Sequence, residues 1–314
     1  MINNGRGLFI YSDPGAAKAV LSQARKLKDH LDDYKILSNR FYSFTNIFGV
    51  KAETFDGNIS DLFDSYNPSF LFAGTSYTSN FELLFIKESL KRNIPCYSFL
   101  DHYVVFKERF KLDNLYIFPN KIFVVDERAK QIAISEGILE DRIEIFGNPY
   151  YNFLKEDYKP EVSKSAYLNS IGIKDHSKKI VAFAPEPTSN INGKQKYGFD
   201  EVEAFEELKK ILDLNNYNCQ LILKLHPNQD MNKLKNKISE KFLILNSDSD
   251  VNTLVYYSDL VIGFFSNILI EAFIMGKEIL RFHLVKVEND PIKELNIGKV
   301  VNANSLKIEL ECLN

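Results

Sequence analysis

The sequence predicts an α/β protein built from two Rossmann-like domains that face a cleft. Short apolar runs alternate with amphipathic stretches of helical length, which is typical of parallel sheets covered by helices on both faces. This alternation breaks once, in a polar segment that follows Pro149, and then restarts. A chain of 314 residues is long enough for two domains, which we place at residues 1–150 and 151–314.

The elements of the two halves are expected in the same alternating order. Each strand is a short apolar run, and each helix has apolar residues at helical spacing. The first half is expected to contain strands at 7–12, 69–74, 96–100, 121–125 and 143–147, and helices at 16–30, 80–92 and 127–136. The connection at 150–179 is expected to contain one helix, at 162–171. The second half is expected to contain strands at 179–184, 219–225, 242–245, 260–263 and 278–282, and helices at 200–214, 231–241, 251–258 and 266–275.

Composition and charge narrow the function classes. The 39 basic and 42 acidic residues give a net charge of −3, so neither half is a basic body and bulk nucleic-acid binding has no electrostatic support. Three cysteines in no metal-binding or paired spacing favour free thiols in a reducing compartment. The first residues lack a signal-peptide layout, and the most apolar run, 261–275, is too short and too polar to span a bilayer. We therefore expect a cytoplasmic protein, with peripheral contact to the inner membrane left open.

The stretch 259–277 carries the most chemical information. A strand ends at Gly263 and a helix begins near Ser266 and Asn267, with serine as a good N-cap residue. Free N–H groups and the dipole at a helix start favour an anion there. Glu271 lies five residues after Ser266, and its carboxylate could accept hydrogen bonds from two ribose hydroxyls. The alternative is a plain capped helix with a solvated glutamate.

Two other strand-end loops of the second half could contact the same ligand. His226, after Lys224 and before a proline, is expected at the carboxyl edge of the sheet, where it could bind a phosphate or protonate a leaving group. An ordinary turn histidine is the alternative. The loop with Pro185, Glu186 and Thr188 could offer hydroxyl and N–H groups to a phosphate, or could be an ordinary polar loop.

The first half offers four candidates for a general base at its strand ends. Asp13 follows the first strand, Glu82 opens the helix after a hydroxyl-rich loop, and Asp101 and His102 follow a third strand. Capping or turn roles are the alternative for each of them.

Several catalytic and metal-binding motifs are absent from the sequence. There is no P-loop, no GxSxG, no HExxH and no CxxC, and the first strand-to-helix loop is not GxGxxG. The pair Asp248 and Asp250 sits in one short polar loop, which is not a full ligand set for a metal. We therefore expect no metal and no cofactor.

The second half resembles the nucleotide-binding domain of GT-B glycosyltransferases and their relatives. The resemblance lies in His226-Pro227 after a strand, in Tyr257-Ser-Asp-Leu-Val-Ile-Gly263 followed by Ser266 and Glu271-Ala272, and in Gly276-Lys277. Gly147-Asn-Pro149 is similar to the interdomain junction of the same superfamily, which includes UDP-N-acetylglucosamine 2-epimerases. The match covers roughly residues 120–282. The glycine-rich Asp-Ser-Gly-Gly loop of the epimerases is replaced here by Gly-Phe-Phe-Ser-Asn.

This resemblance implies a two-domain GT-B fold and a nucleotide-sugar ligand held mainly by the second domain. The His-Pro pair and the helix-starting serine look like those of bacterial sialyltransferases, Kdo transferases and glycerophosphotransferases, which use cytidine nucleotides. The resemblance places His226 and Ser266 at the donor phosphate and Glu271 at the ribose. The implied activity is transfer of a sugar from a CMP-, CDP- or UDP-linked donor to a saccharide acceptor in surface polysaccharide or capsule synthesis. A sugar-nucleotide 2-epimerase or hydrolase, and a non-catalytic binding scaffold in a capsule-assembly complex, are the two alternatives.

Overall fold

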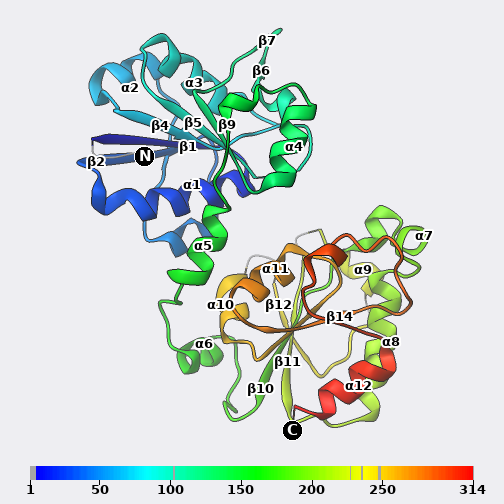
Figure 1. Ribbon diagram of the computed structural model, residues 1–314. Helices are drawn as coiled ribbons and strands as arrows, with labels where there is room; N and C mark the ends of the chain where they lie inside the picture. The colour runs from blue at the N-terminus through cyan, green and yellow to red at the C-terminus, as the bar shows by residue number, and fades with distance from the viewer. Residues whose placement is uncertain (1–4, 102, 227, 235, 247–248, 314) are drawn as a thin grey trace. The chain divides into compact units, whose positions relative to one another are not determined.

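The computed structural model describes residues 5–101, 103–226, 228–234, 236–246 and 249–313, and it divides into two compact units. Unit 1 is Met1–Tyr158 and unit 2 is Lys159–Asn314. In each unit, helices flank a sheet of parallel strands (Figure 1). The predicted α/β class with two Rossmann-like units is confirmed, and the cleft expected between them stays a prediction.

The described residues of unit 1 form a seven-stranded parallel sheet in the order β3-β2-β1-β4-β5-β8-β9. Its strands are β1 (Arg6–Tyr11), β2 (Asp33–Ser38), β3 (Glu53–Thr54), β4 (Phe70–Ala73), β5 (Cys96–Leu100), β8 (Lys121–Val124) and β9 (Ile143–Ile145). An antiparallel hairpin joins β6 (Lys111–Leu112) to β7 (Leu115–Tyr116). The helices are α1 (Pro14–Leu27), α2 (Ile59–Tyr66), α3 (Phe81–Lys91), α4 (Glu127–Ser135) and α5 (Pro149–Glu156).

The described residues of unit 2 form a six-stranded parallel sheet in the order β12-β11-β10-β13-β14-β15. Its strands are β10 (Lys179–Phe183), β11 (Cys219–Lys224), β12 (Phe242–Leu245), β13 (Leu260–Gly263), β14 (Glu278–Phe282) and β15 (Lys299–Val301). The helices are α6 (Lys164–Ser170), α7 (Gly193–Tyr197), α8 (Glu201–Leu214), α9 (Met231–Leu234), α10 (Val251–Tyr257), α11 (Asn267–Ile274) and α12 (Ala303–Glu311).

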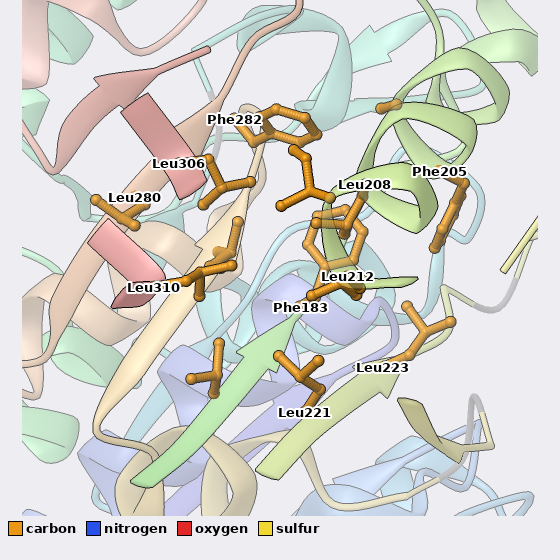
Figure 2. Close-up of a cluster of buried hydrophobic side chains, with 14 of the residues drawn as sticks. Phe183, Phe205, Leu208, Leu212, Leu221, Leu223, Leu280, Phe282, Leu306 and Leu310 are labelled. Atoms are coloured by element: carbon orange, nitrogen blue, oxygen red, sulfur yellow. The ribbon is translucent and has the colours of Figure 1, made fainter. Parts of the chain in front are cut away.

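The central strand β10 of unit 2 shows why its sequence is continuously apolar. Val181 and Phe183 pack into one cluster with residues of α8 and α12, whereas Ile180 and Ala182 pack into a second cluster with residues of α6 and α10. Successive side chains of a strand point to opposite faces, so a sheet that is covered on both faces needs apolar residues at every position. Figure 2 shows the first cluster, in which side chains of α8 and α12 converge on Phe183.

The polar connection after Pro149 contains two helices where one was expected. The predicted helix at 162–171 is α6, and α5 precedes it in unit 1. Asn148 caps α5 by accepting a hydrogen bond from the Tyr150 N–H at 3.0 Å, and Pro149 occupies the first turn. Phe153 packs against Phe48 with ring centroids 4.9 Å apart. The buried face of α5 is only four residues, which is why the surrounding charges concealed it.

Other differences from the predicted elements are local. Strand β2 and helix α2 of unit 1, and β15 and α12 of unit 2, were not expected. The helix expected at 231–241 is wrong in length, because α9 ends at Leu234. In the described part of the chain no helix combines the length and the apolar character needed to cross a membrane. Cys96 and Cys219 are buried free thiols, and Cys312 is an exposed one.

Replacing Phe183 by Ala should lower the free energy of unfolding of unit 2 by about 3–5 kcal/mol, because the truncation leaves a cavity in a packed aromatic cluster. Phe183 is fully buried, and its ring lies 5.4 Å from that of Phe205 and 6.0 Å from that of Phe264. Urea denaturation measures the loss. Phe273→Ala is the matched control, because Phe273 in the same unit is 54% exposed. Equal losses for the two variants would contradict this packing.

Candidate functional site

In both sheets the strand order reverses next to the first strand of the unit. In unit 1 the chain runs from β1 outward to β2 and β3 and returns to the other side of β1 at β4. In unit 2 it runs from β10 to β11 and β12 and returns at β13. Ligands of open parallel sheets bind beyond the carboxyl ends of the strands at such a reversal. The loops after β1, β4, β10 and β13 are therefore where a site is expected.

Helix α11 of unit 2 begins directly after the central strand β13. Gly263 ends the strand, and a Cβ added there would lie 3.0 Å from the Ala184 carbonyl oxygen and 3.1 Å from a Leu269 methyl group. A glycine at this position lets the strand end, the β10 loop and the helix approach closely. Ser266 is the N-cap residue, but its hydroxyl accepts no hydrogen bond from the described N–H groups of the first turn. Asn267, the first helical residue, is exposed.

Glu186, in the loop after β10, extends to the start of α11. Its Oε1 atom accepts a hydrogen bond from the Phe265 N–H at 2.7 Å. Its Oε2 atom is buried and has no hydrogen-bond partner among the described residues. Burial raises the pKa of Glu186 to about 7, while hydrogen bonds from backbone N–H groups, first among them that of Phe265, act in the opposite direction. This carboxyl therefore exchanges its proton near neutral pH.

A second buried carboxylate holds the rest of the β10 loop in place. Glu201, in the first turn of α8, accepts hydrogen bonds from the Thr188 hydroxyl at 3.1 Å and from the Ser189 N–H and hydroxyl at 2.6 Å each. The Thr188 hydroxyl also accepts from the Glu201 N–H at 3.1 Å. Thr188 is thus engaged inside the protein, and Pro185 is buried. Gln229, after β11, donates to Glu201 at 3.2 Å and so ties the β10 and β11 loops together.

His226, in the loop after β11, is exposed and has a defined tautomer. Its Nδ1 atom accepts a hydrogen bond from the Asn228 N–H at 3.1 Å. In the neutral ring the proton is therefore on Nε2, which is left as a donor. Partial burial of the ring and the nearby Lys224 ammonium hold the pKa of His226 below its usual range. At neutral pH the ring is a neutral hydrogen-bond donor at the carboxyl edge of the sheet.

Two further predicted residues are buried in unit 2. Lys224 is 6% exposed, and its Nζ atom donates to the backbone carbonyls of Leu225 at 3.2 Å and Asn246 at 2.8 Å. Glu271 is 5% exposed and is one of the buried residues of α11, with Leu269 and Ala272. Asp250 accepts hydrogen bonds from two N–H groups at the start of α10, and Asp248 lies outside the described residues.

Asp13 of unit 1 joins the loops after β1, β2 and β4. It follows β1, and its Oδ1 atom accepts hydrogen bonds from Arg40 Nη1 and from the Thr78 hydroxyl, each at 3.0 Å. Its Oδ2 atom accepts from the Tyr77 N–H at 3.3 Å. Asp13 is therefore an ion-paired anion that fixes three loops at the reversal of the strand order.

Glu82 lies beside this cluster in the first turn of α3. It is 2% exposed, and its Oε2 atom accepts a hydrogen bond from the Ser12 hydroxyl at 2.8 Å. Its Oε1 atom has no hydrogen-bond partner in the described part of the chain. Burial raises the pKa of Glu82 to about 7; the Ser12 hydrogen bond opposes this rise and the nearby Asp13 charge adds to it. Of the four predicted base candidates, Asp13 and Glu82 are thus brought together.

Asp101 is half-buried and follows β5, the next strand of the sheet after β4. His102 lies outside the described residues, as does Pro227 of the His-Pro pair. Where the structure describes the chain, no group of three or more His, Cys, Asp or Glu residues is placed to hold a metal ion.

Three polar residues at these edges were not predicted from the sequence. Arg40 and Tyr42 follow β2, and the Tyr42 hydroxyl donates to the Ser12 carbonyl at 2.6 Å. They were missed because β2 itself was not predicted. His283 directly follows β14, is 3% exposed, and has its ring 4.9 Å from that of Phe265. The strand at 278–282 was predicted, so the position of His283 after it was the signal that could have identified this residue.

Solved structures of low sequence identity share the fold over almost the whole chain. The UDP-GlcNAc 2-epimerase from Methanocaldococcus jannaschii has a TM-score of 0.66 at 15% sequence identity. The match covers 98% of this chain and 91% of the epimerase chain. The UDP-GlcNAc 2-epimerase from Neisseria meningitidis, bound to UDP-GlcNAc, has a TM-score of 0.67 at 12% identity and covers 96% and 89%. Anabaena HepE in complex with UDP-glucose has a TM-score of 0.58 at 13% identity and covers 98% and 89%. These likenesses confirm the two-domain GT-B-type fold.

Comparison of the sequence with curated proteins found no match. A family model does match, described as CDP-glycerol:poly(glycerophosphate) glycerophosphotransferase, and it spans residues 124–284. That range covers more than half of the chain and contains the loops of Glu186, His226 and Ser266. The protein therefore belongs to the CDP-glycerol:poly(glycerophosphate) glycerophosphotransferase family.

Proposed function

We propose that this protein is a transferase that binds a cytidine-nucleotide donor in unit 2 and passes the activated group to a hydroxyl of a saccharide or polymer acceptor at unit 1. The observation that carries the proposal is the meeting of Glu186, His226 and Ser266 on adjacent strand ends of one sheet. The family name supports a cytidine donor. Backbone N–H groups and neutral side chains that donate hydrogen bonds would hold the phosphate of the donor nucleotide. Such a site needs no metal ion to bind the phosphate.

The residues of unit 2 that we propose to bind the donor nucleotide have three roles. His226 Nε2–H and the N–H groups around Ser266 and Asn267 would bind the donor phosphate and stabilise its charge as the nucleotide departs. Glu271 would bind the ribose hydroxyls. Gly263, Pro185 and Thr188 would shape the site through close backbone approach and through the Glu201 hydrogen bonds, and Lys224 would add positive charge behind His226.

In unit 1 Glu82 is the proposed general base. A carboxyl whose pKa is about 7 can accept a proton from an acceptor hydroxyl near neutral pH. Asp13, held by Arg40 and Thr78, would position the loops around it. Asp101 would lie at the adjacent strand end. Surface polysaccharide or capsule synthesis, with peripheral contact to a membrane, is the setting that we propose for such an acceptor.

The transferred group is either a sugar, as the resemblance to sialyltransferases and Kdo transferases implies, or glycerol phosphate, which the family name indicates. In each case the cytidine nucleotide departs with the charge that the unit 2 groups would stabilise. A sugar-nucleotide epimerase is the second candidate, because the fold is shared with 2-epimerases over 96–98% of the chain. Incubation with UDP-N-acetylhexosamines followed by NMR separates them, since a product formed without any acceptor would favour the epimerase.

Isothermal titration calorimetry should show that CMP and CDP bind wild-type protein more tightly than UDP does. Glu271→Gln should weaken binding roughly tenfold, because a neutral amide makes weaker hydrogen bonds to the ribose hydroxyls than a carboxylate. Glu278→Gln is the matched control, since Glu278 is exposed at the amino end of β14, away from the ligand-binding edge. If none of the three nucleotides gives heat, the donor site is wrong.

His226→Ala should lower turnover on the order of 10²-fold with CDP-glycerol or a CMP-sugar as donor, because a donor to the departing phosphate is lost. His176→Ala is the control. His176 is also exposed but precedes β10, at the opposite edge of the sheet. Turnover measured by nucleotide release should be unchanged for this control. Near-normal turnover of His226→Ala would remove His226 from the mechanism.

Glu82→Gln should lower turnover by about 10²–10⁴-fold, because an amide cannot accept the proton. In the wild type, kcat/KM for the acceptor, measured at saturating donor, should rise with pH around a midpoint near pH 7, since the base acts in its ionised form and the pKa of Glu82 is about 7. Ser12→Ala should move this midpoint to higher pH, because the Ser12 hydrogen bond lowers the pKa of Glu82. A pH profile that Ser12→Ala leaves unchanged would argue against Glu82 as the base.

A further inference from the structure

Glu186 places a carboxyl where the donor phosphate is expected. Its Oε1 atom already accepts the Phe265 N–H at 2.7 Å, one residue before the N-cap of α11. The start of a helix attracts an anion through its free N–H groups and its dipole. The protein therefore holds a carboxyl directly beside the place that a ligand anion would occupy.

The second oxygen of this carboxyl gives an independent indication of a ligand. Oε2 is buried and has no hydrogen-bond partner among the described residues, although a buried polar atom without a partner is costly. A carboxylate oxygen can only accept, whereas a protonated oxygen can donate. A phosphate oxygen beside Oε2 would satisfy it if Oε2 carried a proton, and would repel it if it did not.

We propose that Glu186 is a donor-contacting residue of unit 2 that takes up a proton when the nucleotide phosphate binds, and then donates a hydrogen bond from Oε2 to a phosphate oxygen. The inference rests on the proposed donor site at the start of α11 and assigns to Glu186 a contact that the sequence analysis left undefined. The proton comes from solvent, and the Oε1 contact to the Phe265 N–H is kept. The phosphate thereby gains a neutral donor in a domain whose single arginine, Arg281, is paired with Asp290 at 2.7 Å.

Burial explains why Glu186 can take up a proton near neutral pH. Its pKa of about 7 results from burial, with hydrogen bonds opposing the rise, so in the free protein about half of the molecules are ionised at pH 7. A bound phosphate favours the neutral acid and raises this pKa further. Titratable or charged groups on the elements packed at this edge include Tyr197, Glu201, Lys224, His226, Asp230, Lys233, Glu271, Arg281, His283 and Asp290.

The sign of the pH dependence follows from this rise. When binding raises the pKa of a group, binding is favoured below the free pKa and weakens as pH rises above it. If the phosphate keeps Glu186 protonated throughout this range, uptake should be about half a proton at pH 7 and about 0.9 at pH 8. The Kd should rise about fivefold from pH 7 to pH 8.

The test is calorimetry of the full chain with cytidine 5′-phosphate methyl ester and with UDP-glucose, two phosphodiesters that do not titrate near neutral pH. Titrations in buffers of different ionisation enthalpy give the number of protons taken up at pH 7 and pH 8. Glu186→Gln keeps an oxygen to accept the Phe265 N–H and cannot titrate. Subtracting the proton uptake of this variant from that of the wild type removes the contribution of His226 and His283. The remaining uptake should be about half a proton at pH 7.

Glu278→Gln is the matched control, because Glu278 is an exposed carboxylate of the same unit at the amino end of β14, away from the proposed donor site. It should leave nucleotide-linked proton uptake at the wild-type value. Thermal melting of each variant without ligand shows that it is folded. Equal proton uptake by wild type and Glu186→Gln would overturn the inference while leaving the donor site intact. Absence of binding by the wild type to both probes at every pH would instead overturn the donor site, and the inference with it.

Discussion

A buried carboxyl joins the loops on either side of the strand-order reversal in each unit. In unit 1, Glu82 follows β4 and accepts a hydrogen bond from Ser12, which follows β1. In unit 2, Glu186 follows β10 and accepts from the N–H of Phe265, which follows β13. The strands β1 and β10 correspond in sheet order, as do β4 and β13. The parallel order brings the two loops together, and the carboxyl fixes their separation, so the positions of the other polar groups depend on this contact.

Burial decides which carboxyls at these edges exchange protons near neutral pH. Desolvation disfavours the charged form, and one or two hydrogen bonds offset it only in part, so the pKa of both Glu82 and Glu186 is about 7. Asp13 lies next to Glu82 but is paired with the partly exposed Arg40 guanidinium. Its charge raises the pKa of Glu82. The ion pair of Asp13 and Arg40 thus fixes the loops, while the adjacent Glu82 stays available for proton exchange.

The fold was predictable because buried parallel strands need apolar residues on both faces, and β1 and β10 show this directly in the sequence. Strand β2 was missed because its sequence, DYKILS, begins with polar residues at a partly exposed end, and Arg40 was lost with it. Strand-end position was enough to select Asp13, Glu82 and Glu186 as candidates. Their hydrogen-bond partners lie 27 to 79 residues away in the chain, and no local pattern specifies such pairs.

The shortage of arginine in the second half has a structural counterpart in unit 2. Arg281 is the single arginine after residue 150, and its side chain and that of Asp290 are 7% and 5% exposed. Removing it from this pair to bind a phosphate would leave a buried, uncompensated aspartate, which is strongly destabilising. In the proposed donor site a phosphate would therefore be held by N–H groups, by the neutral His226 ring, by carboxyls that can be protonated and by lysines such as Lys224. A site built mainly from neutral donors releases a doubly charged product more readily than an arginine clamp would, because less Coulombic attraction holds it.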